Sequence, residues 1–158
     1  MYSSRMNNNP EHQIHRLSPL LGLLLKNDRL AEARMETVLK ETQLTPAKMA
    51  ALYELVHAEG PLPLSQLAEQ LHCARSNATQ LVDRLEADGL VKRVHDPIDR
   101  RSVLAQITEE GRNRFLEGAE AITIVERELL EHFTPQEREL FRGFLARLQE
   151  IWHNPQTH

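Results

Sequence analysis

Two short stretches of the chain concentrate hydrogen-bonding and cationic side chains. The first lies within residues 75–84 and contains Arg75, Ser76, Asn77, Thr79, Gln80 and Arg84. The second reads "DPIDRR" at residues 96–101 and ends in Asp99, Arg100 and Arg101. Asparagine and glutamine amides can pair with both edge groups of adenine, and arginine can pair with guanine or with phosphate. The chemistry that these residue types suit is therefore recognition of double-stranded DNA.

The first stretch is expected to lie on a short helix over residues 75–88. Ala78, Leu81, Val82 and Leu85 form one apolar stripe at helical spacing, and Gly89 follows as a C-terminal stop. Ser76, Gln80 and Asp83 then point away from the stripe. A second short helix, "LPLSQLAEQLH", precedes it and is separated by a break at residues 72–74. This arrangement predicts a helix pair whose second member exposes the polar side chains.

The second stretch is expected to form the tip of a β-hairpin over residues 90–107. Short apolar alternations flank it on both sides, and Pro97 favours a turn. Two short helices followed by a two-stranded hairpin predict a winged helix-turn-helix. In such a unit the second helix enters the major groove, and arginines at the hairpin tip suit the negative potential of the minor groove.

The remaining sequence predicts further helices around this unit. Thr45-Pro46, Thr108 and Thr134-Pro135 are start signals. Apolar residues recur at helical spacing over residues 11–42, and Pro19 either begins a helix there or kinks a longer one. We therefore expect a single, mainly α-helical domain over residues 1–158 with a small β-wing, in the order α-α-α-α-β-β-α-α.

Three linked motifs carry a resemblance to a known family. "LVDRLEADGLVKR", "DPIDRR" and "ITEEGR" follow one another within residues 81–112. Together they resemble the core of the MarR family of bacterial transcriptional regulators. The resemblance implies a cytoplasmic, sequence-specific, ligand-responsive repressor. In that family the second arginine of the wing enters the minor groove, which maps to Arg101 in this chain, and Asp99 helps to orient it. Arg100 is expected to support the wing or to meet phosphate.

The resemblance also implies partners. The expected assembly is a homodimer in which helices 11–42 and 108–153 entwine, so that two copies of the DNA-binding lobe 45–107 meet a pseudo-palindromic operator. The expected effector is a small, phenolic or anionic molecule bound between the lobe and the dimerisation helices, with Met35, His57 and Arg112 as candidate lining residues. Two departures from the family pattern stand out: Ala74 replaces a capping Ser or Thr, and Gln80 replaces a frequent arginine.

Composition limits the other classes of function. The chain has 158 residues, a net charge of −4 and 41% hydrophobic residues, and no apolar run approaches a membrane span. The N-terminal residues show no apolar core of a signal peptide. His72, Ser76 and Asp83 lack the strand-turn-helix context of a nucleophile, and no glycine-rich phosphate loop occurs. We expect no enzyme, no cofactor and no metal, since His12 and His15 have no further ligands at suitable spacing.

Two alternatives stay open at this point. Cys73, the single cysteine, could sense oxidants, although a cysteine at such a turn more commonly packs as a small hydrophobe. The winged helix could also serve as a protein-interaction module without binding DNA. Asp28 falls on the apolar stripe of the first helix, where an acid needs either a partner or water.

Overall fold

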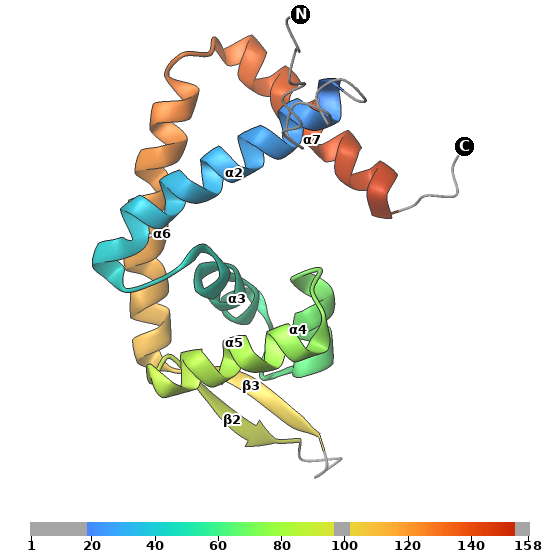
Figure 1. The fold of residues 1–158 in the computed structure, drawn as a ribbon. Helices are drawn as coiled ribbons and strands as arrows, with labels where there is room; N and C mark the ends of the chain where they lie inside the picture. The colour runs from blue at the N-terminus through green and yellow to red at the C-terminus, as the bar shows by residue number, and fades with distance from the viewer. Residues whose placement is uncertain (1–18, 97–101, 154–158) are drawn as a thin grey trace, which may run out of the picture.

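The computed structural model describes residues 19–96 and 102–153, and Figure 1 shows the arrangement of its helices and strands. In chain order the elements are α2 (Pro19–Leu39), the 3₁₀ turn η1 (Lys40–Thr42), α3 (Pro46–His57), β1 (Leu62–Pro63), α4 (Leu64–Gln70), α5 (Arg75–Ala87), β2 (Val91–His95), β3 (Val103–Ile107), α6 (Glu109–Leu130) and α7 (Pro135–His153). The mainly helical class with a small β-wing is confirmed.

The expected helix starts carry the caps that their sequences encode. The Thr45 hydroxyl accepts from the Lys48 N–H at 3.2 Å, with Pro46 at the first helical position. The Thr108 hydroxyl accepts from the Gly111 N–H at 3.0 Å. Capping of this kind satisfies backbone donors that have no partner within the helix.

At the start of α7 the cap is reciprocal. The Thr134 N–H and hydroxyl both donate to Glu137 Oε2 at 2.8 Å, and the Glu137 N–H donates back to Thr134 Oγ1 at 3.3 Å. These hydrogen bonds, the one from the Thr134 backbone first, lower the pKa of the Glu137 carboxyl. The ionised glutamate therefore stabilises the first turn of α7.

The sheet has one more strand than the sequence predicted. Residues 62–63 form β1, which pairs antiparallel with β3 through Leu62↔Ala105 and Pro63↔Leu104. The order in the sheet is β1-β3-β2. The expected helix over residues 62–72 was wrong at its first two residues, which form β1, and at residues 71–72, which form a turn after α4. The partners of β1 lie about 40 residues further along the chain, so no local pattern marks this strand.

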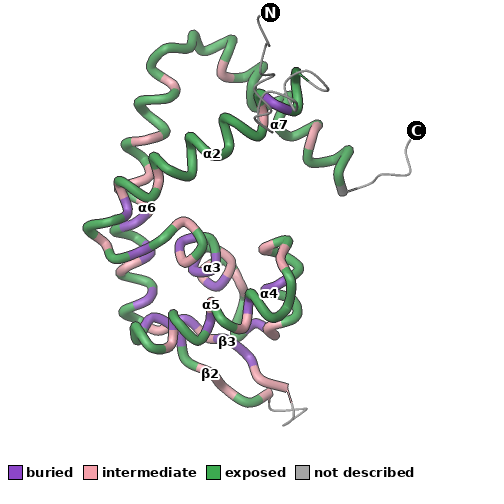
Figure 2. The backbone as a smooth tube through the Cα atoms, viewed as in Figure 1, coloured by how far each residue is buried: buried purple, intermediate pink, exposed green. Residues whose placement is uncertain are grey.

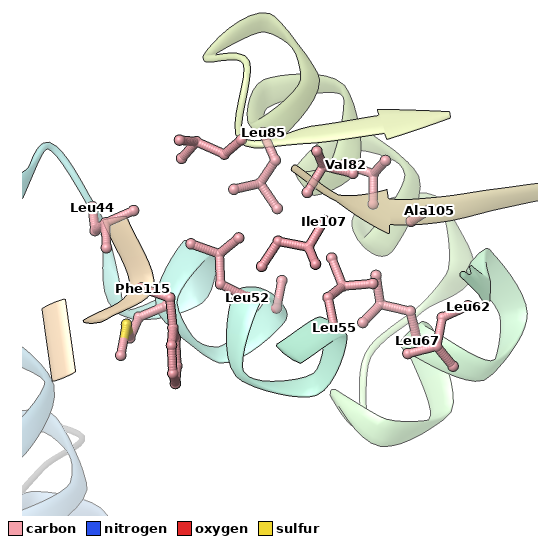
Figure 3. Close-up of a cluster of buried hydrophobic side chains, with 14 of the residues drawn as sticks. Leu44, Leu52, Leu55, Leu62, Leu67, Val82, Leu85, Ala105, Ile107 and Phe115 are labelled. Carbon is pink, nitrogen blue, oxygen red and sulfur yellow. The ribbon is translucent and has the colours of Figure 1, made fainter. Parts of the chain in front are cut away.

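The core lies in the lobe formed by α3, α4, α5 and the sheet. Figure 3 shows Ile107 of β3 between side chains from α3 and α5, with Leu52, Leu55, Leu67, Val82 and Leu85 around it. Leu52, Leu67, Val82 and Leu85 are completely buried. Phe115 of α6 closes the cluster beside α3. The lobe therefore has its own hydrophobic core, and this core holds α5 and the hairpin in place.

Helix α6 joins this lobe to the helices at the other end of the molecule (Figure 1). Gly118 of α6 is buried, and a Cβ at that position would lie 2.8 Å from Leu44 Cδ1 and 2.9 Å from Met49 Sδ. The absence of a side chain thus lets α6 approach the segment before α3 closely. Arg34 of α2 forms a bidentate ion pair with Glu128 of α6, with Nη2 2.7 Å from each carboxylate oxygen.

Helices α2 and α7 are largely exposed within the single chain, as the green backbone of Figure 2 shows. Large apolar side chains are exposed along both. On α2 these include Leu20, Leu23 and Leu30, and on α7 they include Leu140, Phe141, Phe144, Leu145, Ile151 and Trp152. Within residues 19–96 and 102–153, no helix is both long and apolar enough to cross a membrane.

Candidate nucleic-acid interface

Helices α4 and α5 form the expected helix pair, joined by a tight break. Leu67 and Ala68 of α4 are buried, and the Cys73 N–H donates to the Ala68 carbonyl at 3.0 Å. His72 occupies the left-handed region at φ 49° within this break. Ala74 takes the cap position of α5 without a side-chain hydrogen bond, as the departure from the family pattern predicted.

The polar face of α5 is exposed, and its apolar face is buried. Ala78, Val82 and Leu85 are completely buried. The six residues predicted to read DNA lie on this helix: Arg75, Ser76, Asn77, Gln80 and Arg84 are exposed, and Thr79 is half-buried. The Thr79 hydroxyl donates to the Arg75 carbonyl at 2.9 Å and keeps its acceptor capacity. The geometry thus leaves these side chains accessible to a duplex.

The end of α5 leads directly into the hairpin. Gly89 adopts φ 75°, its N–H donates to the Glu86 carbonyl at 2.9 Å, and the Leu90 N–H donates to the Leu85 carbonyl at 2.9 Å. This is a Schellman-type stop, which glycine accommodates without strain. The turn therefore sets the direction in which β2 leaves the helix.

Arg93 of β2 connects the hairpin back to α5. Its Nη2 lies 2.6 Å from Asp83 Oδ1, and its Nη1 lies 2.6 Å from Glu86 Oε2. Partial burial alone would lower the pKa of Arg93, but the hydrogen bonds to Asp83 and Glu86 and their charges raise it. The guanidinium therefore stays charged. Nothing in the sequence predicted this contact between β2 and α5.

The hairpin presents the expected wing. Strands β2 and β3 pair from Val91↔Ile107 to His95↔Val103, and the Asp96 N–H donates to the Ser102 carbonyl at 3.1 Å. Lys92 is exposed on β2. The tip residues Asp99, Arg100 and Arg101 lie outside the described residues, so their predicted role stays a prediction.

The candidate ligand residues lie in three different settings. His57, at the end of α3, has its ring centroid 4.2 Å from that of Tyr53 and 6.3 Å from that of Phe115 on α6. Met35 packs partly buried against the core, and Arg112 is exposed on α6. The structure therefore places His57 in an aromatic cluster with Tyr53 and Phe115, two residues that the sequence analysis missed. Their proximity depends on how α3 packs against α6, and no local sequence pattern identifies Tyr53 and Phe115 as the residues that meet there.

The His57 hydrogen bond defines the state of the ring. Its Nδ1 lies 2.8 Å from the Tyr53 carbonyl, which can only accept, so Nδ1 carries the proton. In the neutral ring Nε2 is then the acceptor, and no other hydrogen bond to His57 is formed within the described part of the chain. Tyr53 beside it is 50% exposed, whereas Phe115 is buried.

The remaining candidates from the sequence are a metal site, the Cys73 thiol and Asp28. No group of three or more His, Cys, Asp or Glu side chains with metal-binding geometry occurs in residues 19–96 and 102–153, and His12 and His15 lie outside this range. Cys73 is a free, half-buried thiol in the break between α4 and α5. Asp28 lies on an exposed part of α2. Two surface hollows of about 500 and 220 Å³ lie along α7 and at the corner of α6 and α7, away from His57.

The helix pair α4 and α5, with its exposed second helix, adjoins a three-stranded sheet in which β2 and β3 form a hairpin. This arrangement defines the winged helix-turn-helix class. The sequence model of the MarR family matches residues 44–103, which span α3 through the start of β3. The chain is 32% identical over 115 residues to the uncharacterized HTH-type transcriptional regulator YsmB of Bacillus subtilis, covering 71% of this chain and 76% of YsmB. The chain belongs to the MarR family.

Solved structures agree with this assignment. A probable transcriptional regulator from Pseudomonas aeruginosa is 32% identical, with a TM-score of 0.74 over 82% of this chain and 96% of that one. The transcriptional repressor CouR bound to a 23-mer DNA duplex is 29% identical, with a TM-score of 0.76 over 84% and 94% of the two chains. Two other Bacillus subtilis relatives, YfiV and YkoM, are matched over 62% and 49% of their own lengths.

Proposed function

We propose that the protein is a sequence-specific DNA-binding transcriptional repressor. The observation that carries the proposal is the exposed polar face of α5 (75–87). The opposite face of α5 is buried in the core, and α4 and β2 both contact the helix. An α-helix of this kind fits the major groove, and the adjoining hairpin reaches the neighbouring minor groove. A similar repressor, CouR, has been solved on DNA. Because such a regulator works on chromosomal DNA, we place it in the cytoplasm.

Each predicted contact residue has an assigned task. Asn77 and Gln80 would pair with adenine edges, Ser76 and Thr79 would meet either bases or phosphate, and Arg75 and Arg84 would take guanine or phosphate. At the wing, Arg101 would enter the minor groove, with Asp99 orienting it and Arg100 on phosphate. Gln80 in place of the family's frequent arginine shifts the expected preference at its base pair from guanine towards adenine.

The direct test is selection of duplexes from a random pool by the purified protein. We expect a recurrent pseudo-palindromic sequence whose affinity falls steeply as salt rises. Asn77→Ala and Arg101→Ala should each weaken binding to that duplex about tenfold, whereas Lys40→Ala in η1 should leave it unchanged. Failure to enrich any sequence, with a folded protein, would support the alternative of an interaction module that does not bind DNA.

We also propose a homodimer formed through α2 and α7. The apolar side chains exposed on these helices, among them Leu20 at 82%, Leu140 at 61% and Phe144 at 61%, have no cover within the described chain and would be buried by a second copy. The hollow of about 500 Å³ lined by Leu140, Gly143 and Phe144 would receive a partner side chain.

Sedimentation of the wild type and of Leu140→Glu/Phe144→Glu tests this assembly. We expect a dimer for the wild type and a monomer of unchanged helicity for the double variant. The monomer should lose affinity for a two-half-site duplex because it can engage one half-site at a time. A wild-type protein that is monomeric at micromolar concentration would contradict the dimer. It would leave the assignment of α5 as the recognition helix unaffected.

For the effector we propose a small phenol bound at Tyr53, His57 and Phe115. The His57 Nε2 acceptor suits a phenolic hydroxyl, and the two aromatic rings suit the ring of the ligand. Met35 and Arg112 remain candidate lining residues, the latter for an anionic substituent. Phenol should release the protein from its duplex at lower concentration than anisole, which has no hydroxyl donor. Equal potency of the two compounds, or an unchanged response in His57→Phe, would exclude this site.

A further inference from the structure

Arg93 of β2 (91–95) contacts α5 (75–87) at three levels along the helix. Its guanidinium lies 2.6 Å from the carboxylates of Asp83 and Glu86, and Nη2 donates to the Thr79 carbonyl at 3.5 Å. The Arg93 backbone N–H donates to the other oxygen of Glu86 at 3.0 Å. One strand residue thus holds the recognition helix through both its main chain and its side chain.

The spacing of these contacts is the informative feature. Residues 79, 83 and 86 are separated by four and three positions, which places them on one face of the helix across about 10 Å of its axis. Contacts on a single face over two turns resist rotation of the helix about its own axis. The apolar residues on the inner face, such as Ala78 and Val82, are completely buried in the core, and the ion pairs add directional contacts on a second face of the helix.

Base recognition is sensitive to such a rotation. Each residue of an α-helix turns the side-chain direction by about 100°, so a small roll of α5 moves Asn77 and Gln80 sideways at the groove floor. Hydrogen bonds weaken steeply once the donor–acceptor distance and angle leave a narrow range. Specific binding should therefore depend on the roll of α5, whereas attraction to any duplex should not.

We propose that Arg93 is a positioning residue for base readout, which fixes the roll of α5 against the wing without itself contacting DNA. The inference rests on the proposed DNA-binding function and deepens it. Arg93 is 26% exposed, and both terminal nitrogens are engaged by carboxylates. The pair also neutralises Asp83, which is 55% exposed and whose charge would repel phosphates. Neutralisation is thus the rival explanation that an experiment must separate from positioning.

Three variants make this separation. Arg93→Gln removes both ion pairs and leaves two uncompensated carboxylates. The triple variant Arg93→Gln/Asp83→Asn/Glu86→Gln removes the pairs together with those charges. Arg114→Gln is the matched control, because Arg114 is also 26% exposed and pairs with Glu110 and Glu117 of its own helix α6.

The measurements use the duplex selected by the wild-type protein and an unselected duplex of the same length, each over a range of salt. We expect Arg93→Gln and the triple variant to bind the selected duplex roughly tenfold or more weakly. The triple variant loses one cation and two carboxylates and is therefore one unit more positive, so it should bind the unselected duplex at least as tightly as the wild type. Its salt dependence should keep the wild-type slope because no phosphate contact is lost. Arg114→Gln should bind both duplexes like the wild type.

Several results would overturn the inference. If the triple variant regains wild-type affinity for the selected duplex, Arg93 acts by neutralising Asp83 and Glu86. If the salt slope falls by about one, Arg93 contacts a phosphate directly. If helicity and both affinities fall together, or if Arg93→Gln matches Arg114→Gln, Arg93 has no specific role in readout. Failure of the wild type to select any duplex would instead refute the proposed function itself.

Discussion

Gly111, in the first turn of α6, is the position where a single methyl group should have the largest effect on the DNA-binding lobe. A Cβ at this position would lie 2.1 Å from the Leu90 carbonyl oxygen and 2.8 Å from Ile107 Cγ1. The Leu90 oxygen already accepts from the N–H and the hydroxyl of Thr108, each at 3.0 Å. Because the obstructing atom belongs to the backbone, no side-chain rotation relieves the overlap.

The magnitude follows from opposing contributions. An ordinary contact needs about 3.4 Å, so α6 or the start of β2 must shift by more than about 1 Å, and overpacking of this kind costs roughly 1–3 kcal/mol. Weakening the Thr108 hydrogen bonds to Leu90 adds about 1 kcal/mol, whereas replacing glycine in a helix returns about 1 kcal/mol. We expect Gly111→Ala to destabilise the fold by about 2 kcal/mol, or roughly 4–8 °C in Tm.

Thermal unfolding followed by circular dichroism measures this difference, with all proteins at one concentration because the proposed dimer would make Tm concentration-dependent. Gly60→Ala is the matched control, since a Cβ there meets nothing within 4 Å. We expect the control to be neutral or slightly stabilising. A Gly111→Ala protein that melts at or above the temperature of the control would refute the close approach of α6 to Leu90.

The other predictions concern the helix starts and the core. Thr108→Ala should cost about 1–2 kcal/mol in urea unfolding, because the Gly111 N–H loses its cap, whereas Thr108→Ser should retain most of the stability. Leu52→Ala should cost about 2–5 kcal/mol, since Leu52 is fully buried; a smaller loss would mean that the core collapses around it. The lowered pKa of Glu137 stabilises α7 above the ordinary glutamate pKa, and this contribution is lost as the pH falls through the lowered value. Glu137→Gln, which also leaves Thr134 with a weaker acceptor, should abolish that acid-side dependence of helicity.

Local sequence signals were sufficient for most of the helical architecture. Thr45, Thr108 and Thr134 each bring a hydroxyl to the cap position, and Gly89 supplies the left-handed residue that ends α5. These effects involve residues within about four positions of one another, so they can be identified without knowing the fold. The same holds for the division of α5 into a buried stripe and an exposed polar face, because helical periodicity alone determines it.

Contacts between segments that are distant in the sequence could not be predicted from these local signals. Strand β1 forms because Leu62 and Pro63 meet β3 about 40 residues later. The His57 cluster forms because α3 packs against α6 at Phe115. In both cases no local sequence pattern distinguishes the residues involved. The tertiary packing of the core determines which distant residues they contact.

Arg93 shows the distinction most directly. Lys92, Arg93, Arg100 and Arg101 form one basic cluster around the wing, and the sequence predicted DNA contact only for Arg100 and Arg101. The alternation along β2 and its exit direction after Gly89 turn Arg93 towards Asp83 and Glu86, while Lys92 remains exposed. Composition and periodicity thus establish that this chain has a basic wing beside a polar helix. Which of those cations is committed to holding the helix depends on strand register and packing, because an ion pair exists only where the fold brings its two charges within a few ångströms.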